Sequence, residues 1–138
     1  MWAMSLRITR QNLAQLLRYA NSAAPGECCG LLFGNTMRIE ELTLTQNISV
    51  TPLTHFEIEP RALIAAEKKS RNIAAGLIGY FHSHPNGKSR PSQIDADMAA
   101  VDGRYWLIIA DQQVTAWRTV PNGSLYGIFN PVELDRVD

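Results

Sequence analysis

Two histidines and an aspartate lie within one short stretch of this sequence, and their types and spacing suit metal chemistry. His82 and His84 are separated by one residue, so both rings lie on the same side of an extended strand. Imidazole nitrogens bind Zn²⁺ well, and Asp95 can return as a third, anionic ligand after a loop that contains two prolines. Three protein ligands leave a fourth position for water, whose pKa on catalytic zinc is about 7. This stretch therefore predicts a catalytic zinc centre.

The same residues also have a simpler interpretation. A single histidine at the end of a strand is more often a surface or core residue than a metal ligand. Ser92 and Asp95 have the spacing of a capping box, in which a serine and an acid three positions later begin a helix. The two interpretations are compatible, because a capped helix would hold both side chains rigidly. Lys88 and Arg90 are interpreted as solvated loop charges.

Hydrolysis at such a centre requires a general base, and several carboxylates are available. Glu27 has the best local context, because it lies where a Pro-Gly turn leads into an apolar run typical of a buried strand. An isolated acid at that place is more often an exposed turn residue. Spacing alone does not choose between Glu27 and the other candidates, which are Glu57, Glu59, Glu67 and Asp97. The third histidine, His55, is interpreted as structural.

Alternating strands and helices are expected to position these residues. Strands are predicted at 6–9, 29–33, 37–48, 77–82, 105–110, 114–119 and 124–129, and a short extended segment is predicted at 55–58. Three helices are predicted: the first begins at residue 9 or 12 and ends near 24, the second runs from 61 to about 74, and the third from 92 to about 101. Thr9 or Asn12 is expected to cap the first helix, and Pro60 to lie in the first turn of the second. This order predicts an α/β fold with a mixed β-sheet core flanked by helices.

Length and composition limit the class of protein. The chain of 138 residues is predicted to be a single domain, residues 1–138, that folds without metal or disulfides. Its 13 basic and 13 acidic residues cancel, which argues against a partner that is nucleic acid or membrane. Cys28 and Cys29 are adjacent, so we expect reduced core residues that face opposite ways. The sequence shows no signal-peptide pattern and no apolar run of about 20 residues, which predicts a cytoplasmic protein.

The order of these residues resembles the JAMM motif of the MPN-domain (JAMM/MPN+) zinc metallopeptidases, in their compact prokaryotic type. The motif runs Glu27, His82-Ser83-His84, seven residues, Ser92, two residues, Asp95, and segment 27–34 and Pro85 agree with it. The resemblance implies that His82, His84 and Asp95 bind one Zn²⁺ per chain. It further implies that Glu27 is the general base and acid, that Ser92 stabilises the oxyanion, and that the fold is an α-β-α sandwich related to the zinc deaminases.

The resemblance also implies a class of substrate. Such proteins cleave peptide or isopeptide bonds at the C-terminal tail of ubiquitin-like or sulfur-carrier proteins, and this chain lacks room for the insertions that grip a second ubiquitin. Two alternatives stay open, namely a non-catalytic MPN-type interaction module and a zinc hydrolase of small molecules. A homodimer is a further expectation, because Trp2 and Leu125 are predicted to be exposed.

Overall fold

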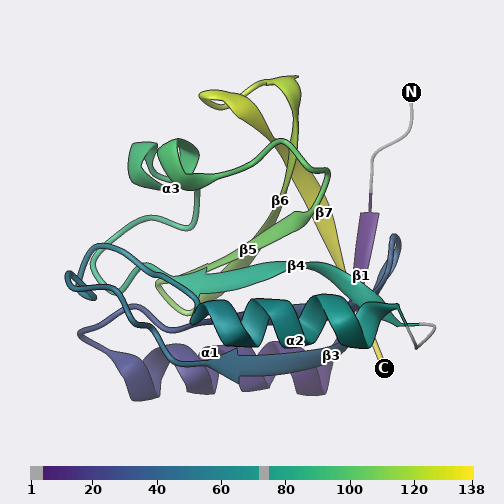
Figure 1. Ribbon diagram of the computed structural model, residues 1–138, viewed down its shortest axis with the longest axis horizontal. Helices are drawn as coiled ribbons and strands as arrows, with labels where there is room; N and C mark the ends of the chain where they lie inside the picture. The colour runs from purple at the N-terminus through teal and green to yellow at the C-terminus, as the bar shows by residue number, and fades with distance from the viewer. Residues whose placement is uncertain (1–4, 72–74) are drawn as a thin grey trace.

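Strands and helices alternate along the chain (Figure 1). The computed structural model describes residues 5–71 and 75–138. The elements are β1 (Ser5–Thr9), α1 (Arg10–Ala23), β2 (Cys29–Asn35), β3 (Arg38–Thr45), α2 (Pro60–Ser70), β4 (Gly76–Ser83), α3 (Gln93–Met98), β5 (Tyr105–Ala110), β6 (Gln113–Gly123) and β7 (Gly127–Val137). Within the described ranges, no helix is both long enough and apolar enough to cross a membrane.

The strands form one mixed sheet in the order β1-β3-β2-β4-β5-β6-β7. Neighbours β4 and β5 are parallel, whereas β5, β6 and β7 form an antiparallel meander, as the sequence predicts. The predicted mixed sheet with flanking helices is confirmed. The sheet also closes on itself, because β1 pairs in parallel with both β3 and β7. That closure is not predicted from the sequence.

Two apolar clusters fill the space between the sheet and its helices. Leu16 of α1 is fully buried in the first cluster, and Ala66 of α2 belongs to the second. Cys28 lies in the first cluster and Cys29 in the second, which confirms that the two side chains face opposite ways. Both thiols are free and buried, and burial raises the pKa of Cys28 to about 11.

The pairing of β2 with β4 positions the site. The two strands are antiparallel, and Cys29 lies opposite His82. The start of β2 therefore lies beside the end of β4, which brings Glu27 next to the two histidines. Gly30 allows this close packing, because a Cβ atom there would lie 2.3 Å from the Phe81 ring.

Some predicted elements differ from the structure. The last strand, predicted at 124–129, is β7 at Gly127–Val137, and β6 continues through an irregular register between Thr119 and Gly123. Leu125 is half-buried against the second cluster rather than exposed, so it does not support the expected dimer surface. Trp2 and the predicted last turn of α2, around residue 73, lie outside the described residues. Thr9 caps α1 and Pro60 begins α2, both as predicted.

Candidate metal centre

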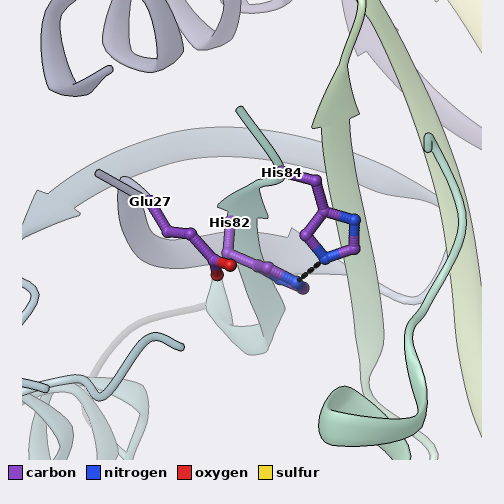
Figure 2. Close-up of side chains that lie close together, drawn as sticks. All are labelled: Glu27, His82 and His84. Atoms are coloured by element: carbon purple, nitrogen blue, oxygen red, sulfur yellow. Dashed lines mark hydrogen bonds between the residues drawn. The ribbon is translucent and has the colours of Figure 1, made fainter. Parts of the chain in front are cut away.

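Three polar side chains converge where β4 ends and α3 begins. The Nε2 atoms of His82 and His84 are 3.0 Å apart. The Oδ1 atom of Asp95 lies 3.1 Å from Nε2 of His82, and its Oδ2 atom lies 3.0 Å from Nε2 of His84. Figure 2 shows the two rings approaching each other through ring nitrogens, where a dashed line marks their contact. All three residues are buried.

These separations fit a tetrahedral metal site. Zinc bonds of about 2.0 Å place neighbouring ligand atoms about 3.3 Å apart, close to the observed distances. Although burial opposes ionisation, hydrogen bonds with His82 and His84 hold the pKa of Asp95 well below its usual range. Burial lowers the pKa of His82, which favours the neutral imidazole that metals bind. The three residues therefore fit a divalent metal.

Different contacts hold the two imidazole rings. Nδ1 of His84 lies 2.9 Å from the carbonyl oxygen of Lys88, so it donates there and leaves Nε2 free for a metal. Nδ1 of His82 has no hydrogen-bond partner among the described residues. That ring instead stacks on Phe56, with centroids 4.2 Å apart, and meets Trp106 edge-on at 5.6 Å. A hydrogen bond thus orients one ring and aromatic packing the other.

Asp95 is held by the start of α3. The Ser92 hydroxyl oxygen accepts a hydrogen bond from the backbone N–H of Asp95 at 3.1 Å. The backbone N–H of Ser92 donates to Oδ2 of Asp95 at 2.9 Å. Both bonds of the predicted capping box are therefore present. The cap fixes the Asp95 carboxylate while its oxygens face the two histidines, so the two interpretations of this segment hold together.

Glu27 is the carboxylate that reaches this cluster. One of its oxygens and the two imidazole nitrogens lie within 4.8 Å of one another, and Figure 2 shows the side chain directed toward His82. The residue is 6% exposed, and its Oε1 atom has no hydrogen-bond partner among the described residues. Burial raises the pKa of Glu27 from 4.5 to about 7, although the His84 charge opposes the rise. An unpaired, buried carboxyl with this pKa suits proton transfer near neutral pH.

The backbone around Glu27 is fixed on both sides. Its N–H donates to the carbonyl of Pro52 at 2.8 Å, and its own carbonyl accepts from Nδ2 of Asn47 at 3.0 Å. The other candidate acids have different surroundings. Glu67 pairs with Arg104, Glu59 caps α2, Asp97 accepts from Gln93, and Glu57 is exposed.

The sequence did not indicate every residue that shapes the centre. Phe56, Trp106 and Asn47 come from segments far from the histidines, and no spacing rule connects them with the motif. Only the fold brings them together. His55, interpreted as structural, lies with its Nδ1 atom 2.7 Å from the Thr54 hydroxyl.

An open pocket of about 390 Å³ gives access to the centre. Glu27, His84 and Ser92 line it, so the carboxyl, a metal-binding ring and a hydroxyl face the same space. Leu53 and Tyr126 are exposed apolar side chains at its wall. The arrangement can place a substrate beside a metal ion, a base and a hydrogen-bond donor.

Known proteins with similar sequences include both assembly proteins and peptidases. The chain is 26% identical over 129 residues to Tail tip assembly protein K of Escherichia phage N15, a match that covers 94% of this chain and 51% of the phage protein. It is 27% identical over 114 residues to a Desampylase of Pyrococcus furiosus, covering 82% of this chain and 80% of that protein. A probable TtuB-protein conjugate cleaving protease of Thermus thermophilus is 33% identical over 88 residues, a match that covers 64% of this chain and 56% of that protein. The chain thus spans about half the length of the phage and Thermus relatives.

Solved structures support the same fold. A protein from Desulfitobacterium hafniense superposes with a TM-score of 0.80 at 27% identity, covering 98% of this chain and 94% of that one. A JAB1/MPN domain protein from Archaeoglobus fulgidus superposes with a TM-score of 0.61 at 24% identity, covering 96% of this chain and 98% of that one. Residues 9–120, from the cap of α1 into β6, match the family of prokaryotic homologues of the JAB domain. The resemblance in the motif, the fold and this match agree, and the chain belongs to that family.

Proposed function

We propose that this chain is a zinc-dependent peptidase or isopeptidase that hydrolyses an amide bond at the C-terminus of a ubiquitin-like modifier or sulfur-carrier protein. One observation carries the proposal: three metal-binding groups lie within 3.1 Å of one another beside a buried, unpaired carboxyl. We assign His82, His84 and Asp95 as the ligands of one Zn²⁺ and Glu27 as the catalytic acid and base.

Each assigned group has one task in amide hydrolysis. Zinc would supply Lewis-acid chemistry, which acidifies water and polarises the amide carbonyl. Glu27 accepts a proton from the attacking water as the new C–O bond forms. It then gives that proton to the amine nitrogen as the C–N bond breaks. In the metal-free protein, burial raises the pKa of Glu27 to about 7, toward the range in which one group can both take and release a proton near neutral pH.

Ser92 is proposed to stabilise the oxyanion. Its oxygen already accepts a hydrogen bond from the Asp95 N–H, which leaves its own O–H available as a donor. The residue also lines the pocket. A donor held rigidly at the start of a helix needs little rearrangement when charge develops on the carbonyl oxygen.

The substrate class is inferred from the peptidases among the relatives. One relative is named Desampylase, and another is named a probable TtuB-protein conjugate cleaving protease. An extended protein tail suits a site of this kind, because main-chain hydrogen bonds supply affinity with little demand on sequence. The exposed apolar side chains of Leu53 and Tyr126 give such a tail a surface to contact.

Metal analysis and a cleavage assay together test the proposal. The purified protein should contain one zinc per chain and should cleave after the last glycine of ubiquitin-like or carrier fusions, and chelation should abolish cleavage. Glu27→Gln should keep the zinc but lose turnover by a factor of 10² or more, in the range of general acid–base catalysis. Glu133→Gln, which changes an exposed carboxyl on β7, is the matched control and should cleave normally.

The alternatives predict different results. A protein that binds no zinc even after reconstitution would support the interaction module. Zinc binding without cleavage of any carrier would support a hydrolase of small molecules or a different protein target, such as a partner in an assembly process. Wild-type turnover in Glu27→Gln would remove the base from the mechanism.

A further inference from the structure

One side-chain amide near the metal centre spends its whole hydrogen-bonding capacity on the backbone of other residues. Asn47 follows β3, and its Nδ2 atom donates to the carbonyls of Glu27 and His55, each at 3.0 Å. Its Oδ1 atom accepts from the backbone N–H of Ser49 at 3.1 Å and from that of Glu57 at 3.0 Å. An amide has two N–H donors and two acceptor lone pairs, so all four are occupied. Asn47 therefore ties together segments that the spacing of the motif does not connect.

Two of the four bonds bracket Phe56. His55 and Glu57 are its neighbours in sequence, so the Asn47 amide fixes the backbone on both sides of this aromatic residue. An isolated antiparallel bridge between Asn47 and Ile58 strengthens the same contact. The position of the Phe56 ring therefore depends on Asn47.

The Phe56 ring is in turn the stacking partner of a candidate metal ligand. Its centroid lies 4.2 Å from that of His82 with 20° between the ring planes, and both residues are buried. Rotation of the imidazole would drive its edge into the Phe56 face, so the stack holds the ring orientation. Nδ1 of His82 has no hydrogen-bond partner among the described residues, whereas a metal-binding histidine usually donates from this second nitrogen. Packing thus does for His82 what the Lys88 carbonyl does for His84.

The other Nδ2 bond leads to the proposed base. Glu27 precedes β2 by two residues, and its carbonyl accepts this bond. One planar amide is therefore bonded both to the backbone of the base and to the backbone that carries the stacking ring. The fixed angle between the two N–H bonds sets the spacing of these segments. A change at residue 47 would move Glu27 and His82 relative to each other.

We propose that Asn47 is a positioning residue of the metal centre, which holds the base Glu27 directly and the ligand His82 through Phe56. Neither Asn47 nor Phe56 binds the metal or transfers a proton. The inference rests on the proposed function, because it assigns two further residues to the same centre. Zinc affinity and turnover then depend on a side chain that lies outside the motif.

Zinc affinity, measured by competition with a chromophoric chelator, tests this role without an activity assay. Asn47→Ala and Phe56→Leu should each raise the Kd for zinc about ten- to hundredfold, the range for loss of an outer contact of a metal-binding histidine. The visible spectrum of the Co²⁺-loaded variants should change as well, because the ligand geometry changes. Phe56→Tyr keeps a ring that can stack and should keep the wild-type Kd. The double variant Asn47→Ala/Phe56→Leu should resemble the weaker single variant, because both changes act through the His82 ring.

Turnover at saturating zinc separates the two branches of the contact. Only Asn47 is bonded to the backbone of Glu27, so Asn47→Ala should lower kcat by up to about 10²-fold, and by more than Phe56→Leu does. KM should change little, because neither side chain lines the pocket that opens on the centre.

Two variants control for a general loss of packing. Phe129→Leu removes a fully buried ring of the same cluster, whose centroid lies 5.3 Å from that of Trp106. Asn130→Ala removes an amide whose Oδ1 atom accepts from the backbone N–H of Ser124 at 2.9 Å. Both should keep the wild-type Kd for zinc whatever their stability in urea. Should Asn47→Ala fail to fold, Asn47→Asp replaces it, because aspartate keeps the acceptors and loses both donors.

Several results would overturn the inference and leave the proposed peptidase standing. These are wild-type zinc affinity in Phe56→Leu or in the folded variant of Asn47, an equal loss of affinity in Phe129→Leu, and multiplied effects in the double variant. A wild-type protein that binds no zinc would refute both the inference and the proposed function.

Discussion

Replacing Glu27 by glutamine should stabilise the metal-free protein at alkaline pH. The carboxyl is buried, and its pKa rises from 4.5 to about 7 in the folded state. Between these values the folded protein keeps a proton that the unfolded chain releases, so wild-type stability falls as pH rises. One pH unit corresponds to about 1.4 kcal/mol, so the full loss between pKa values of 4.5 and about 7 is at most about 3.5 kcal/mol. Glutamine carries no charge at any pH and does not suffer this loss.

Urea unfolding in the presence of a chelator measures the difference. At pH 8 the free energy of unfolding of Glu27→Gln should exceed that of wild type by about 2–3 kcal/mol, and at pH 4.5 the two should nearly coincide. Titrating groups remote from Glu27 are common to both proteins and cancel, whereas His84 interacts electrostatically with Glu27 and contributes to the difference. Glu133→Gln should follow wild type throughout, because its carboxyl is exposed. Parallel stability curves for Glu27→Gln and wild type between pH 4.5 and 8 would refute the claim that a buried, unpaired carboxyl lies at this site.

Three further predictions concern the metal and the reaction. His84→Ala should lose zinc, shown by metal analysis, yet unfold cooperatively in urea, because His84 belongs to neither apolar cluster. One zinc per chain at wild-type affinity would show the ligand assignment to be wrong. Ser92→Ala should reduce kcat by about 10²-fold, as for loss of an oxyanion donor. The same change should lower the free energy of unfolding by about 1 kcal/mol, because the helix loses its cap. An unchanged kcat would exclude the oxyanion role. The kcat/KM of wild type should fall on acidification, because protonated Glu27 cannot accept a proton, and bound zinc should move this fall to a pH below the metal-free pKa of about 7. A kcat/KM that stays constant until the metal dissociates would contradict that role.

The sequence predicted the parts of the centre that are local. His82 and His84 share a strand face, and Ser92 with Asp95 forms a capping box. Both relations depend on spacing along a few residues, so they can be read without knowing the fold. The choice of Glu27 among five acids could not be made in this way. It depends on β2 pairing with β4 in a register that sets Cys29 opposite His82.

The parts of the fold that escaped prediction are nonlocal. The sheet closes on itself because β1 pairs with β7, and this pairing joins the two ends of the described chain. Period-two patterning indicates that a strand exists but does not indicate its partner. The same limit explains the last two strands, which were predicted at 114–119 and 124–129 but run from Gln113 to Gly123 and from Gly127 to Val137. Leu125 was expected to be exposed, but it packs against the second cluster, a contact that depends on the fold of this segment.

The centre also explains why the fold tolerates an unfavourable buried group. In the metal-free protein, Glu27 has a buried oxygen without a partner, and such a group costs stability wherever it becomes charged. A cation held by His82, His84 and Asp95 would lie near that carboxylate and favour its charged form. Metal binding would then recover part of the lost stability, in addition to the stabilisation that any ligand of the native state provides. The two clusters can offset this cost because neither includes Glu27. The same unpaired carboxyl that weakens the apo fold at high pH is thus the group left free to move a proton.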